Sequence, residues 1–241
     1  RISIVIPCHR HDASTLIDAL ARCTASPLAE IILYDDGSGD HALLAQMQAA
    51  AGSVRAAVRI VSSPANRGPA AARNAAAMHA RAAWILLLDA DMSPGSMGFI
   101  EAYLDAEEKL EEPSVVVGGQ SLRFAPKVKA FALHRWHDLP DCLSADERRK
   151  APGRYVFSSN ILVHRDVLKA CPFDEGFSGW GWEGLDWGLK VAARFPVMHI
   201  DNPATHLGLE SDRALMARYA KSAGNFARFV WRHPEHTETM P

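Results

Sequence analysis

Two aspartates separated by one residue, Asp89 and Asp91, follow an apolar run from Trp84 to Leu88. The run predicts a buried strand, so both carboxylates come where the chain leaves the core and meets solvent. Two carboxylates this close together can share one hard divalent cation, Mn²⁺ or Mg²⁺, whose remaining positions are taken by water and phosphate oxygens. Such an ion would neutralise a diphosphate as it leaves a reacting centre. Because Asp-x-Asp also occurs by chance in loops, the surrounding elements decide its meaning.

Strand and helix patterns alternate through residues 1–118 and place these aspartates at the edge of a sheet. We expect strands at residues 2–6, 31–34, 58–61, 84–88 and 115–117, and helices after Asp12 or Ser14, after Asp40, over residues 70–83 and from Ser93-Pro94. This alternation is typical of a Rossmann-like α/β sandwich with a mainly parallel sheet. Ligands of such sheets bind beyond the carboxyl ends of the strands, where Asp35, Asp36, Asn66 and the two later aspartates fall.

The pattern loosens in residues 119–157 and becomes regular again towards the end of the chain. There we expect a strand at 161–163, helices at 166–170 and 186–195, a strand at 197–200 and one long helix over 211–231. No repeat or low-complexity linker separates the two parts. We therefore predict one compact body of two halves, residues 1–118, whose sheet edge carries the candidate ligand residues, and residues 119–241.

Composition excludes several other classes of protein. Of the 241 residues, 48% are hydrophobic and 22% charged, as in ordinary globular domains, and the net charge of −2 does not favour nucleic acid. Four cysteines without a CxxC pair predict reduced thiols and a cytoplasmic location. The longest apolar run, Ala82 to Leu88, cannot span a bilayer, so we expect no transmembrane segment, although peripheral association with the cytoplasmic face of a membrane fits. No signal peptide opens the chain, which starts at Arg1 without Met, so we expect that flanking segments were removed.

Four motifs in order resemble those of family-two glycosyltransferases with a GT-A fold. They are Ile6-Pro7-Cys8-His9-Arg10, Tyr34-Asp35-Asp36-Gly37-Ser38, the run Asn66 to Asn74 and Leu88-Asp89-Ala90-Asp91. A later stretch, Phe177 to Glu183, resembles the Gly-Trp-Gly-x-Glu-Asp acceptor motif of these enzymes and of galactosyltransferases. The resemblance covers residues 1–118 and 158–230, and implies a nucleotide-sugar-dependent transferase of the kind found in polysaccharide biosynthesis. It makes residues 1–118 the nucleotide-sugar-binding half and residues 119–241 the acceptor-binding half with the C-terminal helix.

The resemblance also implies a role for individual residues. The donor nucleotide would lie against Pro7, Cys8, His9, Asp35, Asp36, Asn66, Arg73, Asp89 and Ala90. Asp36 would accept a hydrogen bond from a pyrimidine base, which favours a UDP-sugar. Asp91 and His206 would hold the metal, Mn²⁺ or Mg²⁺. The sugar or acceptor would contact Asn160, Trp180, Gly181 and Trp182, because flat aromatic faces pack against sugar rings.

Position 184 departs from the family pattern, because the Asp that relatives use as catalytic base is Gly184. Glu183 and Asp186, three residues apart, would share one helical face and are the two candidate replacements. The resemblance favours inversion at the sugar carbon, with a glycan or other hydroxyl compound as acceptor.

Two other functions are left open by the sequence. One is a non-catalytic, carbohydrate-binding or scaffold homologue, which the missing Asp at 184 would explain. The other is a sugar nucleotidyltransferase, which the absence of glycine from the segment Pro7 to Asp12 disfavours.

Overall fold

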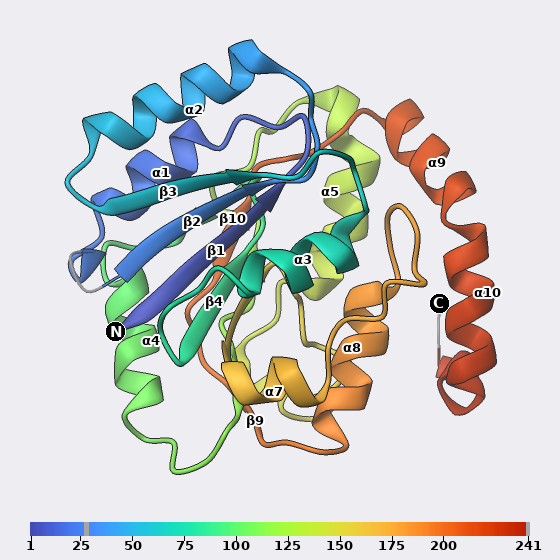
Figure 1. The fold of residues 1–241 in the computed structure, drawn as a ribbon. Helices are drawn as coiled ribbons and strands as arrows, with labels where there is room; N and C mark the ends of the chain where they lie inside the picture. Colours follow the sequence, from blue (N-terminus) through green and yellow to red (C-terminus); the bar gives the residue numbers. More distant parts are fainter. Residues whose placement is uncertain (27–28, 240–241) are drawn as a thin grey trace.

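The computed structural model describes residues 1–26 and 29–239, which form an α/β fold around a seven-stranded sheet (Figure 1). Across the sheet the order is β3 (Ala57–Ser62), β2 (Ala29–Asp35), β1 (Ile2–Cys8), β4 (Trp84–Leu88), β8 (Asn160–His164), β6 (Val115–Val117) and β9 (Val197–His199). Strands β1 to β4 run parallel, whereas β8 lies antiparallel between β4 and β6. The predicted α/β class with a mainly parallel sheet is confirmed. Strands from both halves of the chain share this sheet.

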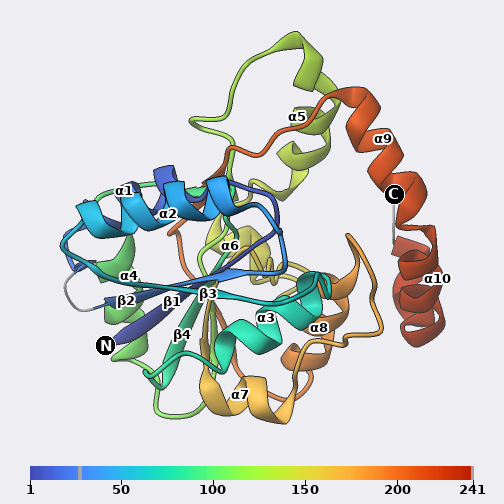
Figure 2. The same cartoon turned by 45° about the horizontal axis from the view of Figure 1, so that its top comes forward.

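Helices cover both faces of the sheet (Figures 1 and 2). One face is covered by α1 (Ser14–Ala21), α2 (His41–Ser53) and α4 (Phe99–Glu107). The other is covered by α3 (Pro69–Ala77), α7 (Arg165–Ala170) and α8 (Glu183–Ala192). As predicted, the side chain of Asp40 caps α2, accepting a hydrogen bond from the N–H of Leu43.

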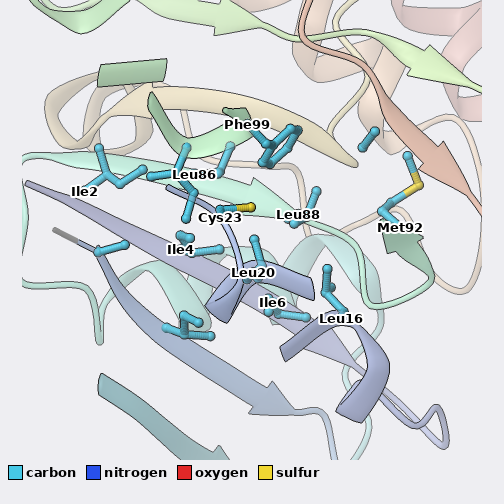
Figure 3. Packing of buried hydrophobic residues seen from close by; sticks show 14 of the residues in the cluster. Ile2, Ile4, Ile6, Leu16, Leu20, Cys23, Leu86, Leu88, Met92 and Phe99 are labelled. Atoms are coloured by element: carbon cyan, nitrogen blue, oxygen red, sulfur yellow. The ribbon is translucent and has the colours of Figure 1, made fainter. Parts of the chain in front are cut away.

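Alternation along the central strands produces these two packed layers. In β1, Ile2, Ile4 and Ile6 pack in the core on the side of α1 and α4 (Figure 3). Val5, between them, packs in the core on the side of α3. These side chains are at most 1% exposed, so β1 is buried on both sides. Pro7 does not end the strand as expected, because it lies beyond the part of β1 that pairs with β4.

A small second sheet joins the two halves of the chain beside the end of β4. It consists of β5 (Met92–Pro94), β10 (Ala204–His206) and β7 (Gln120–Ser121), with β5 and β10 antiparallel. The prediction of a helix starting at Ser93-Pro94 is therefore wrong, and α4 begins at Phe99 instead. The hydrogen bonds that β10 offers from far along the chain outweigh the local Ser-Pro signal.

The second half adds helices that surround the strand ends. Between β7 and β8 lie η2 (Lys129–Phe131), α5 (Ala132–Asp138), η3 (Leu139–Asp141) and α6 (Ala145–Arg148), and the chain ends with α9 (Asp212–Lys221), α10 (Ala223–Arg232) and η4 (Pro234–Thr239). The predicted long helix over 211–231 is wrong in one respect: it breaks at Ser222, whose hydroxyl donates to the carbonyl of Tyr219. Ser222 and Gly224, two residues further on, are weak helix formers, which explains the position of the break. Within the described ranges, no helix is long and apolar enough to cross a bilayer.

Candidate active site

The carboxyl ends of three adjacent strands bring the predicted donor residues together. Strand β1 lies between β2 and β4, so Cys8 and Asp35 pair in register and Asp89 follows β4 on the other side. The N–H of Asp36 donates to the carbonyl of Cys8 at 2.8 Å. This contact joins the first two motifs of the sequence at one sheet edge.

Asp36 is buried and uses only one of its carboxylate oxygens within the protein. Oδ2 accepts hydrogen bonds from the N–H groups of Arg67 and Gly68, each at 3.0 Å, at the start of α3. Oδ1 is buried and has no hydrogen-bond partner among the described residues. A buried carboxylate oxygen without a partner is costly, and a ligand N–H group would compensate that cost.

Asp35 and Ser38 form the turn beside it, in which Oδ1 of Asp35 accepts from the N–H (3.1 Å) and the hydroxyl of Ser38. Asp35 therefore organises the turn that holds its neighbour. Cys8 is buried, and burial together with Asp35 and Asp36 raises the pKa of its thiol to about 12. The thiol is neutral at physiological pH. Of the other residues predicted to contact the donor, Pro7 is half-buried and Asn66 is exposed.

His9 is exposed and lies at the same edge, with Nδ1 3.0 Å from the carbonyl oxygen of Asp36. The next residue, Arg10, has a left-handed backbone with φ +51°, and its N–H donates to the hydroxyl of Ser38. The loop after β1 is therefore tied to the loop after β2 through side chain and backbone.

Asp91 and His206 face each other because β5 and β10 pair. His206 is opposite Met92 in the register, and its Nε2 lies 3.4 Å from Oδ2 of Asp91. The N–H of Leu207 donates to the carbonyl of Asp91, and a side chain at Gly208 would collide with the Asp91 carboxylate. A carboxylate and an imidazole nitrogen at this separation form a set of donors that suits Mn²⁺, which accepts both oxygen and nitrogen ligands. The residues thus fit the predicted metal.

Asp138 orients His206 and was not predicted from the sequence. Its Oδ2 lies 2.7 Å from Nδ1 of His206, and its Oδ1 lies 2.9 Å from Nδ1 of His137. A carboxylate that accepts Nδ1–H fixes the imidazole with Nε2 towards a metal, as is usual for histidine ligands. Burial lowers the pKa of His206 but Asp138 and Asp91 outweigh it, raising that pKa to about 10. Without a metal the imidazole is therefore protonated, and a metal would bind Nε2 by displacing its proton. The pKa of Asp138 is held well below its usual range, because two histidine hydrogen bonds overcome the effect of burial.

His134 completes this cluster from the same helix. Ligand atoms of His134, Asp138 and His206 all lie within 4.8 Å of one another. Nδ1 of His134 accepts from the N–H of Glu210 at 2.8 Å, and burial lowers the pKa of the imidazole, so it is neutral. Residues 134 and 138 are four apart on α5 and therefore share a face, a spacing that could have identified them in the sequence.

Arg73 connects Asp89, which follows β4, to Glu183, the first residue of α8. Its Nη2 donates to both carboxylate oxygens of Asp89 at 2.9 Å, and its Nη1 donates to Oε1 of Glu183 at 3.0 Å. Burial opposes the charge of the guanidinium, but the two carboxylates raise its pKa above the ordinary value. Oε2 of Glu183 is buried and has no partner among the described residues. One oxygen of Glu183 is thus fixed and the other is free to accept a proton or hydrogen bond.

Trp182 sets the direction in which Glu183 enters the site. Its backbone is left-handed, with φ +75°, and α8 begins at the next residue, three residues earlier than predicted. A large residue in this conformation is strained and persists only where surrounding contacts hold it. Here the ring packs on Phe226 and Phe229 of α10, and the amide of Asn225 donates to the carbonyl of Gly181 at 3.0 Å. Helix α10 therefore holds the loop that presents Glu183.

Trp180 is the more exposed of the predicted aromatic residues, at 36%, with Tyr219 against its edge and Arg218 over its ring. Gly184, in place of the family's Asp, leaves its side-chain position next to the hydroxyl of Ser158, 3.1 Å from an added Cβ. An added side chain at Gly184 would therefore press on Ser158.

The structure does not bring Asp186 and Asn160 into this site. Asp186 is fully buried, with Oδ1 3.0 Å from both Arg232 and His233 and Oδ2 3.4 Å from Lys190, so it anchors the end of α10 and cannot meet an acceptor. Asn160 is also fully buried, with hydrogen bonds to the hydroxyl of Tyr103 and to two backbone carbonyls. The predictions of a base at 186 and of a sugar contact at 160 are corrected to structural roles.

Two hollows lie among the described residues, and only one of them is lined by residues of the candidate site. A cavity of about 170 Å³ lies between the start of α1 and the β5–β10 pair, lined by His11, Asp12, Thr15, Leu16, Ala90, Asp91, Met92, Ser93, Leu207 and Gly208. A more open hollow of about 480 Å³ lies beside α7 and α8 and is lined by none of the predicted site residues. The smaller one, which reaches Ala90 and Asp91, is the one that bears on the candidate site.

Comparison with known proteins agrees with this geometry. The chain is 25% identical over 271 aligned positions to validoxylamine A glucosyltransferase from Streptomyces hygroscopicus subsp. limoneus, covering 97% of this chain and 57% of that protein. It is 34% identical over 140 positions to the succinoglycan biosynthesis protein ExoU of Rhizobium meliloti, covering 50% of this chain and 39% of that protein. The chain thus spans little more than half the length of the first of these relatives.

Solved structures share the fold at low identity. A mannosyltransferase from Pyrobaculum calidifontis in complex with GDP-Man and Mn²⁺ has a TM-score of 0.67 at 15% identity, covering 92% of this chain and 61% of that one. S. aureus TarS 1–349 in complex with UDP-GlcNAc has a TM-score of 0.64 at 16% identity, and the match covers 88% of this chain and 60% of that one. The fold is therefore GT-A. Because the model of the family "Glycosyl transferase family 2" matches residues 3–171, the chain belongs to this glycosyltransferase family.

Proposed function

We propose that this chain transfers a sugar from a nucleoside diphosphate sugar, with a UDP-sugar favoured, to a hydroxyl acceptor with inversion, using a divalent metal. The observation that carries the proposal is the meeting of Asp91 with His206, oriented by Asp138, beside the end of β4. Mn²⁺ bound there would supply positive charge to the leaving diphosphate. The relatives that share the fold were solved with UDP-GlcNAc or with GDP-Man and Mn²⁺, which supports the same class of donor.

Asp36 provides the proposed recognition of the base. Its free Oδ1 accepts but cannot donate, so it matches the N–H of uracil N3 or guanine N1. Cytosine and adenine carry an acceptor at the corresponding position, and we expect them to be rejected. The site should therefore bind UDP, dTDP or GDP better than CDP or ADP.

Glu183 is the base that we propose. Arg73 holds Oε1, and the free Oε2 would take the proton of the acceptor hydroxyl as its oxygen attacks the sugar carbon. Trp180, Gly181 and Trp182 would line the acceptor side, as in the motif that they resemble. Arg73 would hold Asp89 towards the donor sugar or ribose through the same guanidinium.

Titration calorimetry with UDP, GDP, CDP and ADP tests this proposal, in buffer with Mn²⁺ or with EDTA. We expect metal-dependent binding of UDP and no binding of CDP or ADP. Equal affinity in the two buffers would refute the metal role, and equal affinity for UDP and CDP would refute the role of Asp36.

A non-catalytic carbohydrate-binding homologue is the second candidate function, favoured by Gly184 and by the structural role of Asp186. Such a protein would bind the nucleotide sugar without turning it over. Release of UDP from UDP-sugars, with water or added glycans as acceptor, separates it from an active transferase.

A further inference from the structure

The segment between β7 and α6 exposes an unusual number of large apolar side chains. Phe124 is 54% exposed, Val128 49%, Trp136 73% and Leu139 61%. The segment is nevertheless well packed underneath, where Leu122, Ala125 and Leu209 form a small core against Phe131 and Cys142. Figure 2 shows the segment rising from the body of the molecule around α5, so its outer side is open.

The charges on this segment are almost all positive. Arg123, Lys127 and Lys129 are exposed, and Arg123 stacks on the ring of Phe124 at 5.1 Å. The only acidic residues from 122 to 141 are Asp138, which is buried, and Asp141, which is half-buried. This local charge contrasts with the net charge of −2 of the whole chain. Exposed aromatic and aliphatic side chains among lysines and arginines match the interface of an anionic bilayer.

Helix α5 relates this surface to the candidate active site. His134 and Asp138, four residues apart, face the metal ligand His206, whereas Trp136 is half a turn away and points outwards. A surface that rests on the outer side of α5 would therefore lie at the rim of the site without blocking it.

We propose that the basic apolar surface formed by Phe124, Lys127, Val128, Lys129, Trp136 and Leu139 docks this chain on an anionic lipid bilayer. The charge complementarity selects this occupant over a neutral partner, because the two exposed lysines of this surface, Lys127 and Lys129, would be unpaired against a neutral one. Docking in this way would present the active-site rim to acceptors held at the membrane surface. The inference does not depend on the identity of the donor sugar.

Co-sedimentation with phosphatidylglycerol-containing vesicles, compared with pure phosphatidylcholine vesicles, tests the proposal. Wild type should bind the anionic vesicles, and binding should weaken when salt is raised from about 0.1 M to 0.5 M. Lys127→Gln together with Lys129→Gln should weaken partitioning about thirtyfold, since each basic residue near an anionic surface contributes on the order of fivefold. Trp136→Ala together with Leu139→Ala should weaken it about tenfold or more through lost apolar insertion.

Trp231→Ala is the matched control, because Trp231 is 83% exposed but lies at the far end of α10 from α5 (Figure 1). This variant should bind vesicles like wild type. The proposal is overturned if wild type does not bind anionic vesicles, if it binds neutral ones equally, or if the control variant loses as much binding as the Trp136 variant. UDP affinity measured on the same variants should not change, so failure here would leave the proposed donor site intact.

Discussion

Replacing Glu183 with glutamine separates catalysis from folding at the proposed base. Glutamine has the same shape and keeps an oxygen that can accept a hydrogen bond from Nη1 of Arg73. In the wild-type structure this nitrogen lies 3.0 Å from Oε1 of Glu183. Arg73 also keeps both of its contacts with Asp89, so no buried charge loses its last partner. The change removes the ability of the free Oε2 to take a proton and little else.

The expected magnitudes follow from these contacts. Exchanging a charged for a neutral acceptor in one buried hydrogen bond should cost about 1 kcal/mol of unfolding free energy. Losing a positioned general base should lower kcat about 10²- to 10⁴-fold, or about 3–5 kcal/mol of transition-state stabilisation. Affinity for the donor should change little, because Asp36 and Asp91 belong to other elements.

Asp186→Asn is the matched control, since it makes the same chemical change one turn further along α8. Asp186 is paired with Arg232 and His233, so this variant should lose about 2–3 kcal/mol of stability while its folded fraction keeps near-normal kcat. The measurements are urea unfolding and steady-state transfer at a temperature at which both variants are folded. The reasoning is refuted if Glu183→Gln keeps kcat within threefold of wild type, on the order of experimental scatter, or if Asp186→Asn abolishes turnover while remaining folded.

Four further outcomes are expected. Asp91→Asn should lower Mn²⁺-dependent UDP affinity about 100-fold by calorimetry, since a metal ligand is lost, and an unchanged affinity would place the metal elsewhere. Asp138→Asn should weaken Mn²⁺ binding about 10- to 100-fold, measured by electron paramagnetic resonance of the free ion, and an unaltered Mn²⁺ affinity would reduce Asp138 to packing. Asp36→Asn should turn its free atom into a donor and shift nucleotide preference from UDP towards CDP, so an unchanged preference in competition binding would count against base recognition. In EDTA, the contribution of His206 to the free energy of unfolding should be complete below about pH 6.5 and should be lost as the pH rises towards its folded pKa of about 10. The measurement is the difference in unfolding free energy between wild type and His206→Asn. A difference that stays constant across this pH range would contradict the ion pairs of His206 with Asp138 and Asp91.

Much of the first half of the chain could be predicted from the sequence because its signals are local. Each strand of the first half is a short apolar run that ends at polar residues, and parallel strands bring those ends to one edge. Asp36 and Asp89 therefore fell at the correct edge without knowledge of any long-range contact. The cap of α2 by Asp40 is equally local and was predictable for the same reason.

The contacts that complete the site join residues far apart in the chain and depended on the tertiary structure. The pairing of β5 with β10 places His206 at Asp91, although the sequence at Ser93-Pro94 favours a helix start. Likewise Arg73 meets Glu183 across 110 positions. Periodicity reports which face of an element is buried, but not which distant element covers that face.

Glu183 and Asp186 illustrate this division between sequence and tertiary structure. The sequence favoured Glu183, the nearest replacement for the missing Asp, but left Asp186, three residues further along the same helix, as a second candidate base. The left-handed turn at Trp182, held by α10, starts α8 so that Glu183 reaches Arg73, while the same α10 covers Asp186 with Arg232 and His233. The sequence by itself determined the fold class and the acids available for chemistry. Only the packing of α10 on α8 separated these two. Arg232 and His233 engage Oδ1 of Asp186 and Lys190 engages Oδ2, whereas Oε2 of Glu183 has no partner among the described residues.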